Sequence, residues 1–194
     1  MIIGVGVEGP SDLRFWTKVL HKHLPHVKFD VRNMKNRSRL IRETNRLLES
    51  FRHLHYNSCL VLLDRDSAPC NSEVLSEFDE LVRSEATKPL TERYLHILIA
   101  VRELEAWYLA DEQAIQTVFP NQDYQAPHDT SELNAERVIS SFWKSEFGGS
   151  ALNKIELAGL ISPKFSPQRA MECSTSFMHT WKRITFTVSQ GSGR

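Results

Sequence analysis

Cysteine, long apolar stretches and net charge are all scarce in this sequence, and each shortage excludes a class of protein. The 194 residues include three cysteines, Cys59, Cys70 and Cys173, none of them in a CxxC pair. The sequence therefore predicts free thiols in a reducing compartment, the cytoplasm, and no zinc site built on cysteine. The longest apolar runs, residues 59–63 and 97–101, hold five residues each, whereas a membrane span needs about 20. We expect no membrane contact, and the first residues show no signal peptide.

Charge is balanced in sum but not along the chain. The 24 Lys and Arg residues match the 24 Asp and Glu residues, which excludes a protein that holds nucleic acid by bulk charge. Residues 28–52 nevertheless contain eight basic and three acidic residues, and residues 64–93 contain eight acidic and four basic ones. Either one surface attracts phosphate while another gathers carboxylates, or both segments are solvated helix faces.

Apolar segments that alternate with amphipathic segments predict an α/β fold. The strands are expected at residues 2–7, 27–32, 58–63 and 94–101. The intervening helices are expected at residues 13–24, 40–54 and 72–84. Strands separated by helices are typical of βαβ units, so we expect a mainly parallel sheet with all strand carboxyl ends at one edge.

The character of the chain changes after residue 110. A polar segment at residues 121–131 predicts a surface loop, and further helices are expected at residues 131–144, 150–160 and 174–184. We therefore predict a core domain at residues 1–110, a helical extension at residues 111–188 and a flexible tail at residues 189–194.

Acidic residues follow the predicted strands, at the sheet edge where open parallel sheets bind ligands. They are Glu8, Asp12, Asp64, Asp66, Glu103 and Glu105. Carboxylates suit hard cations such as Mg²⁺ or Mn²⁺. Asp12 could instead stabilise a helix N-terminus. Glu103 and Glu105 would share the edge if the chain stays extended there, and would diverge if a helix begins at once.

Lys154, in the segment ALNKIEL, has two possible roles. A lysine can neutralise the charge of a phosphate undergoing attack, as a compact point charge. Most lysines on helices only solvate the helix surface. Spacing alone leaves both roles open.

The segments VEGPSD, LLDRD and RELEAW together resemble the Toprim domain of topoisomerases, bacterial primases and nucleases. The resemblance extends to small Toprim-like proteins of unknown function and to the overcoming-lysogenization-defect (OLD) nucleases. It implies a four-stranded parallel sheet between helices. It implies metal binding or acid–base work for Glu8 and Asp12, and metal binding for Asp64 and Asp66. Glu103 or Glu105 would be a further ligand, and Lys154 would lie near the scissile phosphate.

These observations predict a nuclease that uses two divalent ions, Mg²⁺ or Mn²⁺, to hydrolyse phosphodiesters of nucleic acid, with DNA preferred over RNA. The phosphate track would be the arginines Arg37, Arg39, Arg42 and Arg46. A homodimer or a partner chain would supply further contacts to the nucleic acid. The resemblance suggests that such a partner is a separate ATPase chain and that the protein has a role in phage defence. One alternative is a non-catalytic subunit of such an ATPase. Another is a small-molecule phosphatase that uses Asp64 as nucleophile and Asp66 as acid.

Overall fold

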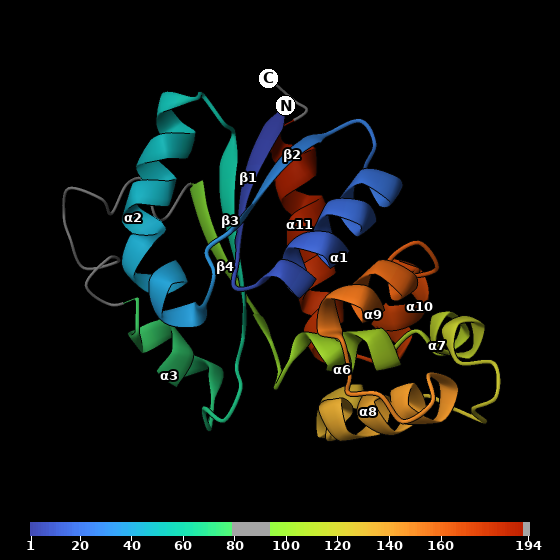
Figure 1. Ribbon diagram of the computed structural model, residues 1–194. Coiled ribbons are helices and arrows are strands. Elements are labelled where there is room, and N and C mark those ends of the chain that lie inside the picture. Colours follow the sequence, from blue (N-terminus) through green and yellow to red (C-terminus); the bar gives the residue numbers. More distant parts are fainter. Residues whose placement is uncertain (79–93, 192–194) are drawn as a thin grey trace.

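Four apolar segments form the strands of one sheet in the computed structural model, which describes residues 1–78 and 94–191 (Figure 1). The strands are β1 (Ile2–Val7), β2 (Lys28–Asn33), β3 (Ser58–Asp64) and β4 (Leu95–Ala100). Their order is β2-β1-β3-β4, and every neighbouring pair is parallel. The predicted α/β class with a four-stranded parallel sheet between helices is confirmed.

Helices connect and cover the strands. The first three are α1 (Pro10–His23), α2 (Arg37–His53) and α3 (Asn71–Ser76). After β4 come α6 (Leu104–Leu109), α7 (Glu112–Val118), a 3₁₀ turn η1 (Thr130–Glu132), α8 (Ala135–Glu146), α9 (Lys154–Ile161), α10 (Pro167–Glu172) and α11 (Thr175–Gly191). Sequence analysis missed α7 and α10, because six or seven residues are too few to show a helical period. Most of the predicted helix at residues 72–84, from residue 79 on, lies outside the described residues, as do residues 192–194 of the predicted tail.

The two faces of the sheet carry separate apolar clusters. Alternation along β3 sends Cys59, Val61 and Leu63 toward α2, and Leu60 and Leu62 toward α1 and the C-terminal helices. Figure 1 shows α2 on one side of the sheet and α1 and α11 on the other.

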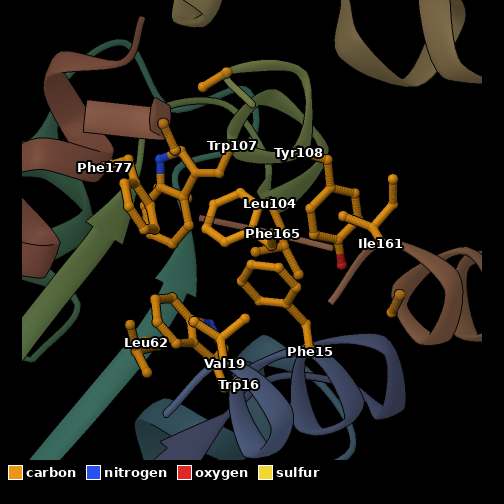
Figure 2. Packing of buried hydrophobic residues seen from close by; sticks show 14 of the residues in the cluster. Phe15, Trp16, Val19, Leu62, Leu104, Trp107, Tyr108, Ile161, Phe165 and Phe177 are labelled. Carbon is orange, nitrogen blue, oxygen red and sulfur yellow. The ribbon is translucent and has the colours of Figure 1, made fainter. Parts of the chain in front are cut away.

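The larger cluster is rich in aromatic rings (Figure 2). Phe15 of α1 contacts Tyr108 of α6 at 4.9 Å between ring centroids and Phe165 at 5.0 Å. Trp107 of α6 contacts Phe177 of α11 at 5.4 Å. The C-terminal helices therefore share one core with the strands, and this shared core fixes α6 and α9 next to the carboxyl edge of the sheet.

Two glycines of β1 permit the close approach of α2. A Cβ atom on Gly4 would lie 2.2 Å from the ring of Phe51, and one on Gly6 would lie 2.6 Å from the side chain of Leu47. The Gly-x-Gly sequence in β1 thus serves packing. In the part of the chain that the structure describes, no helix is both long and apolar enough to cross a membrane.

Candidate metal site

Glu8 joins the carboxyl ends of β1 and β3. Its Oε1 accepts a hydrogen bond of 2.8 Å from the backbone N–H of Asp64. Burial raises the pKa of Glu8 to about 7, and the nearby charges of Asp66 and Asp12 act in the same direction, whereas the bond from Asp64 and the charge of Arg37 oppose it. Two acids that are 56 residues apart in sequence therefore meet at the sheet edge, as the sequence predicted.

Asp64, Asp12 and Glu105 lie together on the α1 side of this edge. Burial raises the pKa of Asp64 well above its ordinary value, and the charges of Asp12 and Glu105 raise it further. Burial also raises the pKa of Asp12 to about 6, again helped by the charge of Glu105. Asp12 in addition accepts the N–H of Gly9 at 3.0 Å, so it caps α1 as well as facing the other acids.

Lys154 supplies a positive charge to this group of acids. Its ammonium lies 3.1 Å from Oε1 of Glu105, which is buried, and 3.1 Å from Oε2 of Glu136. Burial alone would lower the pKa of Lys154, but these two carboxylates raise it above its ordinary value. Lys154 is therefore an ammonium ion held at the site rather than a solvated helix residue.

The alternative left open for Glu103 and Glu105 is resolved by the start of α6. The helix begins at Leu104, directly after Glu103, so the two side chains diverge. Glu103 accepts the backbone N–H of Glu136 at 2.7 Å, and burial raises its pKa. Glu105 is the residue that faces Asp64 and Asp12.

The segment that contains Asp64 and Asp66 is not extended, which corrects the expectation that both carboxylates project from one side. Asp66 has a φ of 52°, in the left-handed region, and its N–H donates to the carbonyl oxygen of Arg102, whose own φ is 69°. The turn leaves Asp66 exposed and 3.4 Å from a guanidinium nitrogen of Arg37.

The predicted arginine track is divided in the structure. Arg37 donates to the carbonyl oxygen of Asp64 at 2.7 Å and also pairs with Glu77. Arg39 pairs with Glu43 at 3.0 Å on the same helix. The other two members of the track, Arg42 and Arg46, are exposed, and the structure gives them no bond to a described residue.

Sequence analysis missed Tyr108 and Glu136. The hydroxyl of Tyr108 is buried and has no hydrogen-bond partner among the described residues. Burial raises its pKa, and the charges of Glu105, Asp12 and Asp64 raise it further, so this hydroxyl lies near the acids. The spacing of three residues between Glu105 and Tyr108 on one helix was a usable signal. Glu136 had no such signal, because only tertiary packing brings it to Lys154.

No three side chains of His, Cys, Asp or Glu within residues 1–78 and 94–191 are already arranged as ligands of one metal ion. The acids share an edge without converging on a point. The chemistry of the donors still fits a hard divalent cation, because several carboxylates with raised pKa values lie at the end of a parallel sheet. The buried hydroxyl of Tyr108, which has no hydrogen-bond partner in the described part of the chain, lies beside them.

The family model described as "Domain of unknown function (DUF4276)" matches residues 7–185. The chain belongs to the DUF4276 family. The match includes every acid of the candidate site and Lys154.

This DUF4276 chain also resembles a solved structure. The C-terminal region of the Burkholderia pseudomallei OLD protein aligns with it at a TM-score of 0.56 and 16% sequence identity, over 96% of this chain and 98% of that chain. At this identity the likeness shows a common fold, as the sequence resemblance to OLD proteins implied. A search of curated proteins gave no match.

Proposed function

We propose that this DUF4276 protein is a divalent-metal-dependent nuclease. The observation that carries the proposal is the meeting of four acids at the edge where parallel sheets bind ligands. Glu8 and Asp64 come from the ends of β1 and β3, and Asp12 and Glu105 come from the first turns of α1 and α6. The fold shared with the C-terminal region of the OLD protein supports the same function.

Glu8, Asp12, Asp64 and Glu105 are the residues that would hold Mg²⁺ or Mn²⁺, with Asp66 as a further ligand from the adjacent turn. Bound divalent cations would offset the repulsion among these acids, polarise a phosphodiester and lower the pKa of a water molecule. Glu8 and Asp64 already lie side by side, at the ends of the paired strands β1 and β3.

Lys154 would bind a phosphate oxygen of the substrate. Its ammonium is held between Glu105 and Glu136, so it is charged and oriented before the substrate arrives. Arg42 and Arg46 would bind flanking phosphates on the exposed side of α2, since neither is engaged with a described residue.

Nicking of supercoiled plasmid in MnCl₂ or MgCl₂ tests this function. We expect the wild-type protein to nick, and EDTA to stop the reaction. Asp64→Asn should reduce the rate at least 100-fold, because it removes a ligand charge while it keeps the shape. Asp123→Asn, on an exposed loop residue, is the matched control and should leave the rate unchanged. Nicking that survives Asp64→Asn would remove the proposal.

Metal binding can be measured without activity. Mn²⁺ should raise the melting temperature of the wild-type protein progressively as its concentration increases, and Asp64→Asn should abolish the rise. An unchanged melting temperature at millimolar Mn²⁺ would contradict a metal site.

A second candidate is a non-catalytic subunit that acts with a separate chain. The observation that favours it is the lack of three pre-arranged ligands among the described residues. A protein that neither binds Mn²⁺ nor nicks plasmid by itself, yet binds a separate ATPase chain, would support this candidate.

A further inference from the structure

The outer edge of β4 is open in the part of the chain that the structure describes. β4 is the last strand of the sheet. The carbonyl oxygen of Ala100 accepts a hydrogen bond from the backbone N–H of Arg65, the residue after β3, so the backbone groups of Ala100 face β3. Successive residues of a strand direct their backbone groups to opposite sides, so Ile97 and Ile99 direct their N–H and C=O groups away from β3. Within residues 1–78 and 94–191, no backbone group bonds to this outer side. An open edge is a template for another extended segment.

A hollow of about 950 Å³ follows this edge between two helices. On one side lies α3 with Leu75, which is 42% exposed, and on the other lies α11 with Phe186, which is 53% exposed. Ile97 and Ile99 belong to the apolar cluster on the α2 face, and Leu98 belongs to the cluster on the α11 face. The edge of the sheet thus forms the floor, and large apolar side chains stand on both walls.

The α11 wall is basic. Lys182 and Arg183 are exposed on it, and the guanidinium of Arg183 lies 6.0 Å from the ring of Phe186. The ring of His96 on β4 has its pKa lowered by burial and then by the charge of Arg183. The acidic residue among those that line the hollow is Asp129.

The charges around the hollow indicate which kind of molecule it binds. A second copy of this chain, related by a two-fold axis, would bring its own Lys182 and Arg183 opposite those of the first copy. The like charges would repel each other. Nucleic acid would satisfy the cations but would leave Leu75, Phe186 and the outward N–H groups of β4 without suitable partners. An extended polypeptide with acidic side chains satisfies all of these groups.

We propose that the edge of β4 binds an extended segment of a partner protein as an added strand, with apolar and acidic residues in alternation. Its apolar side chains would pack on the α3 side against Leu75, Ile97 and Ile99. On the α11 side the carboxylates of its acidic residues would face Lys182 and Arg183, and the methylene groups of the same residues would cover Phe186. Main-chain hydrogen bonds give affinity in this mode of binding, and the alternating side chains give specificity. The proposal is independent of the nuclease function, because none of these residues belongs to the candidate metal site.

Three labelled peptides of eight residues test the proposal by fluorescence anisotropy with the full chain. The first alternates Val and Glu, the second has the same composition with all Val residues before all Glu residues, and the third alternates Val and Lys. We expect the first to bind at least tenfold more tightly than either of the others. If the two Glu peptides bound equally, charge attraction alone would explain the binding and the proposal would be overturned. The absence of binding at a peptide concentration of about 1 mM would also overturn it.

Surface variants locate the bound peptide. Arg183→Glu and Phe186→Ala each change an exposed residue, so the fold should be retained, and each should weaken the Val-Glu peptide roughly tenfold. Lys144→Glu makes the same charge change on an exposed residue of α8 and should leave binding unchanged. A double variant, Lys182→Glu with Arg183→Glu, should bind the Val-Lys peptide better than the wild-type protein does. Equal weakening by Lys144→Glu would place the peptide elsewhere.

Amide hydrogen exchange provides a readout of the added strand itself. The N–H groups of Ile97 and Ile99 should become protected when the Val-Glu peptide binds. Binding without this protection would contradict strand addition. An oligomer of the chain that Arg183→Glu dissociates would instead assign the edge to a second copy and overturn the proposal.

Discussion

The stability of the metal-free protein should depend on the charge of Glu8. Burial raises the pKa of this carboxyl from 4.5 to about 7 in the folded chain. The unfolded chain has the ordinary value, so folding favours the protonated form. The resulting stability is present below pH 4.5 and is lost as the pH rises to about 7. Glu8→Gln cannot ionise, and the amide oxygen can still accept the N–H of Asp64.

The size of the effect follows from the two pKa values. The difference between 4.5 and about 7 corresponds to roughly 3 kcal/mol, at about 1.4 kcal/mol for each tenfold change in proton affinity. Glu8 is partly exposed, so solvent screening reduces the expected gain to about 1–2 kcal/mol. Glu8→Gln should therefore be more stable than the wild-type protein by this amount at pH 8, and nearly equal to it at pH 4.5.

Urea unfolding in EDTA, followed by tryptophan fluorescence, measures this difference at both pH values. Glu49→Gln, on an exposed residue of α2, is the matched control and should show no pH-dependent gain. A variant at Glu8 that gains equally at both pH values, or that loses stability at pH 8, would refute the assignment of burial as the cause. With Mn²⁺ at pH 8, the wild-type protein should recover more stability than Glu8→Gln.

Three further substitutions have expected results. Lys154→Gln leaves the buried carboxylate of Glu105 without its cation, so the melting temperature should fall by an amount equivalent to about 1–3 kcal/mol, and Lys154→Arg should restore most of it. Asp111 is fully buried, pairs with the guanidinium of Arg169 at 2.6 Å and caps α7. Asp111→Asn should therefore lower the free energy of unfolding, measured in urea, by about 3 kcal/mol with or without Mn²⁺. Gly4→Ala should cost about 1–3 kcal/mol by the same measurement, because its Cβ would overlap the ring of Phe51; an unchanged stability would show that α2 can shift.

Local patterns were sufficient to predict the strands and the acids at their ends. β1 and β3 are continuous apolar runs that stop at an acid, and a parallel sheet must bring such ends to one edge. For this reason the contact between Glu8 and Asp64 was predictable from one sequence, although the sequence separation is large.

The side-chain partners were not predictable in the same way. The bond between Lys154 and Glu105 depends on how α9 packs beside α6, and no local pattern encodes that packing. The left-handed φ of Asp66 is uncommon for any residue other than glycine, so the extended conformation was the natural but wrong expectation. The pairing of Arg37 and Arg39 with acids likewise follows from geometry that composition does not show.

The chain of touching aromatic rings from α1 through α6 to α11 has a thermodynamic consequence. Phe15, Trp107, Phe165 and Phe177 come from segments on both sides of residue 110, and none of them could be withdrawn without exposing another to water. Melting should accordingly be a single event in which the sheet and the helical extension lose their structure together. The ion pairs between Lys154 and the two carboxylates it faces would then form and break together with the rest of the fold.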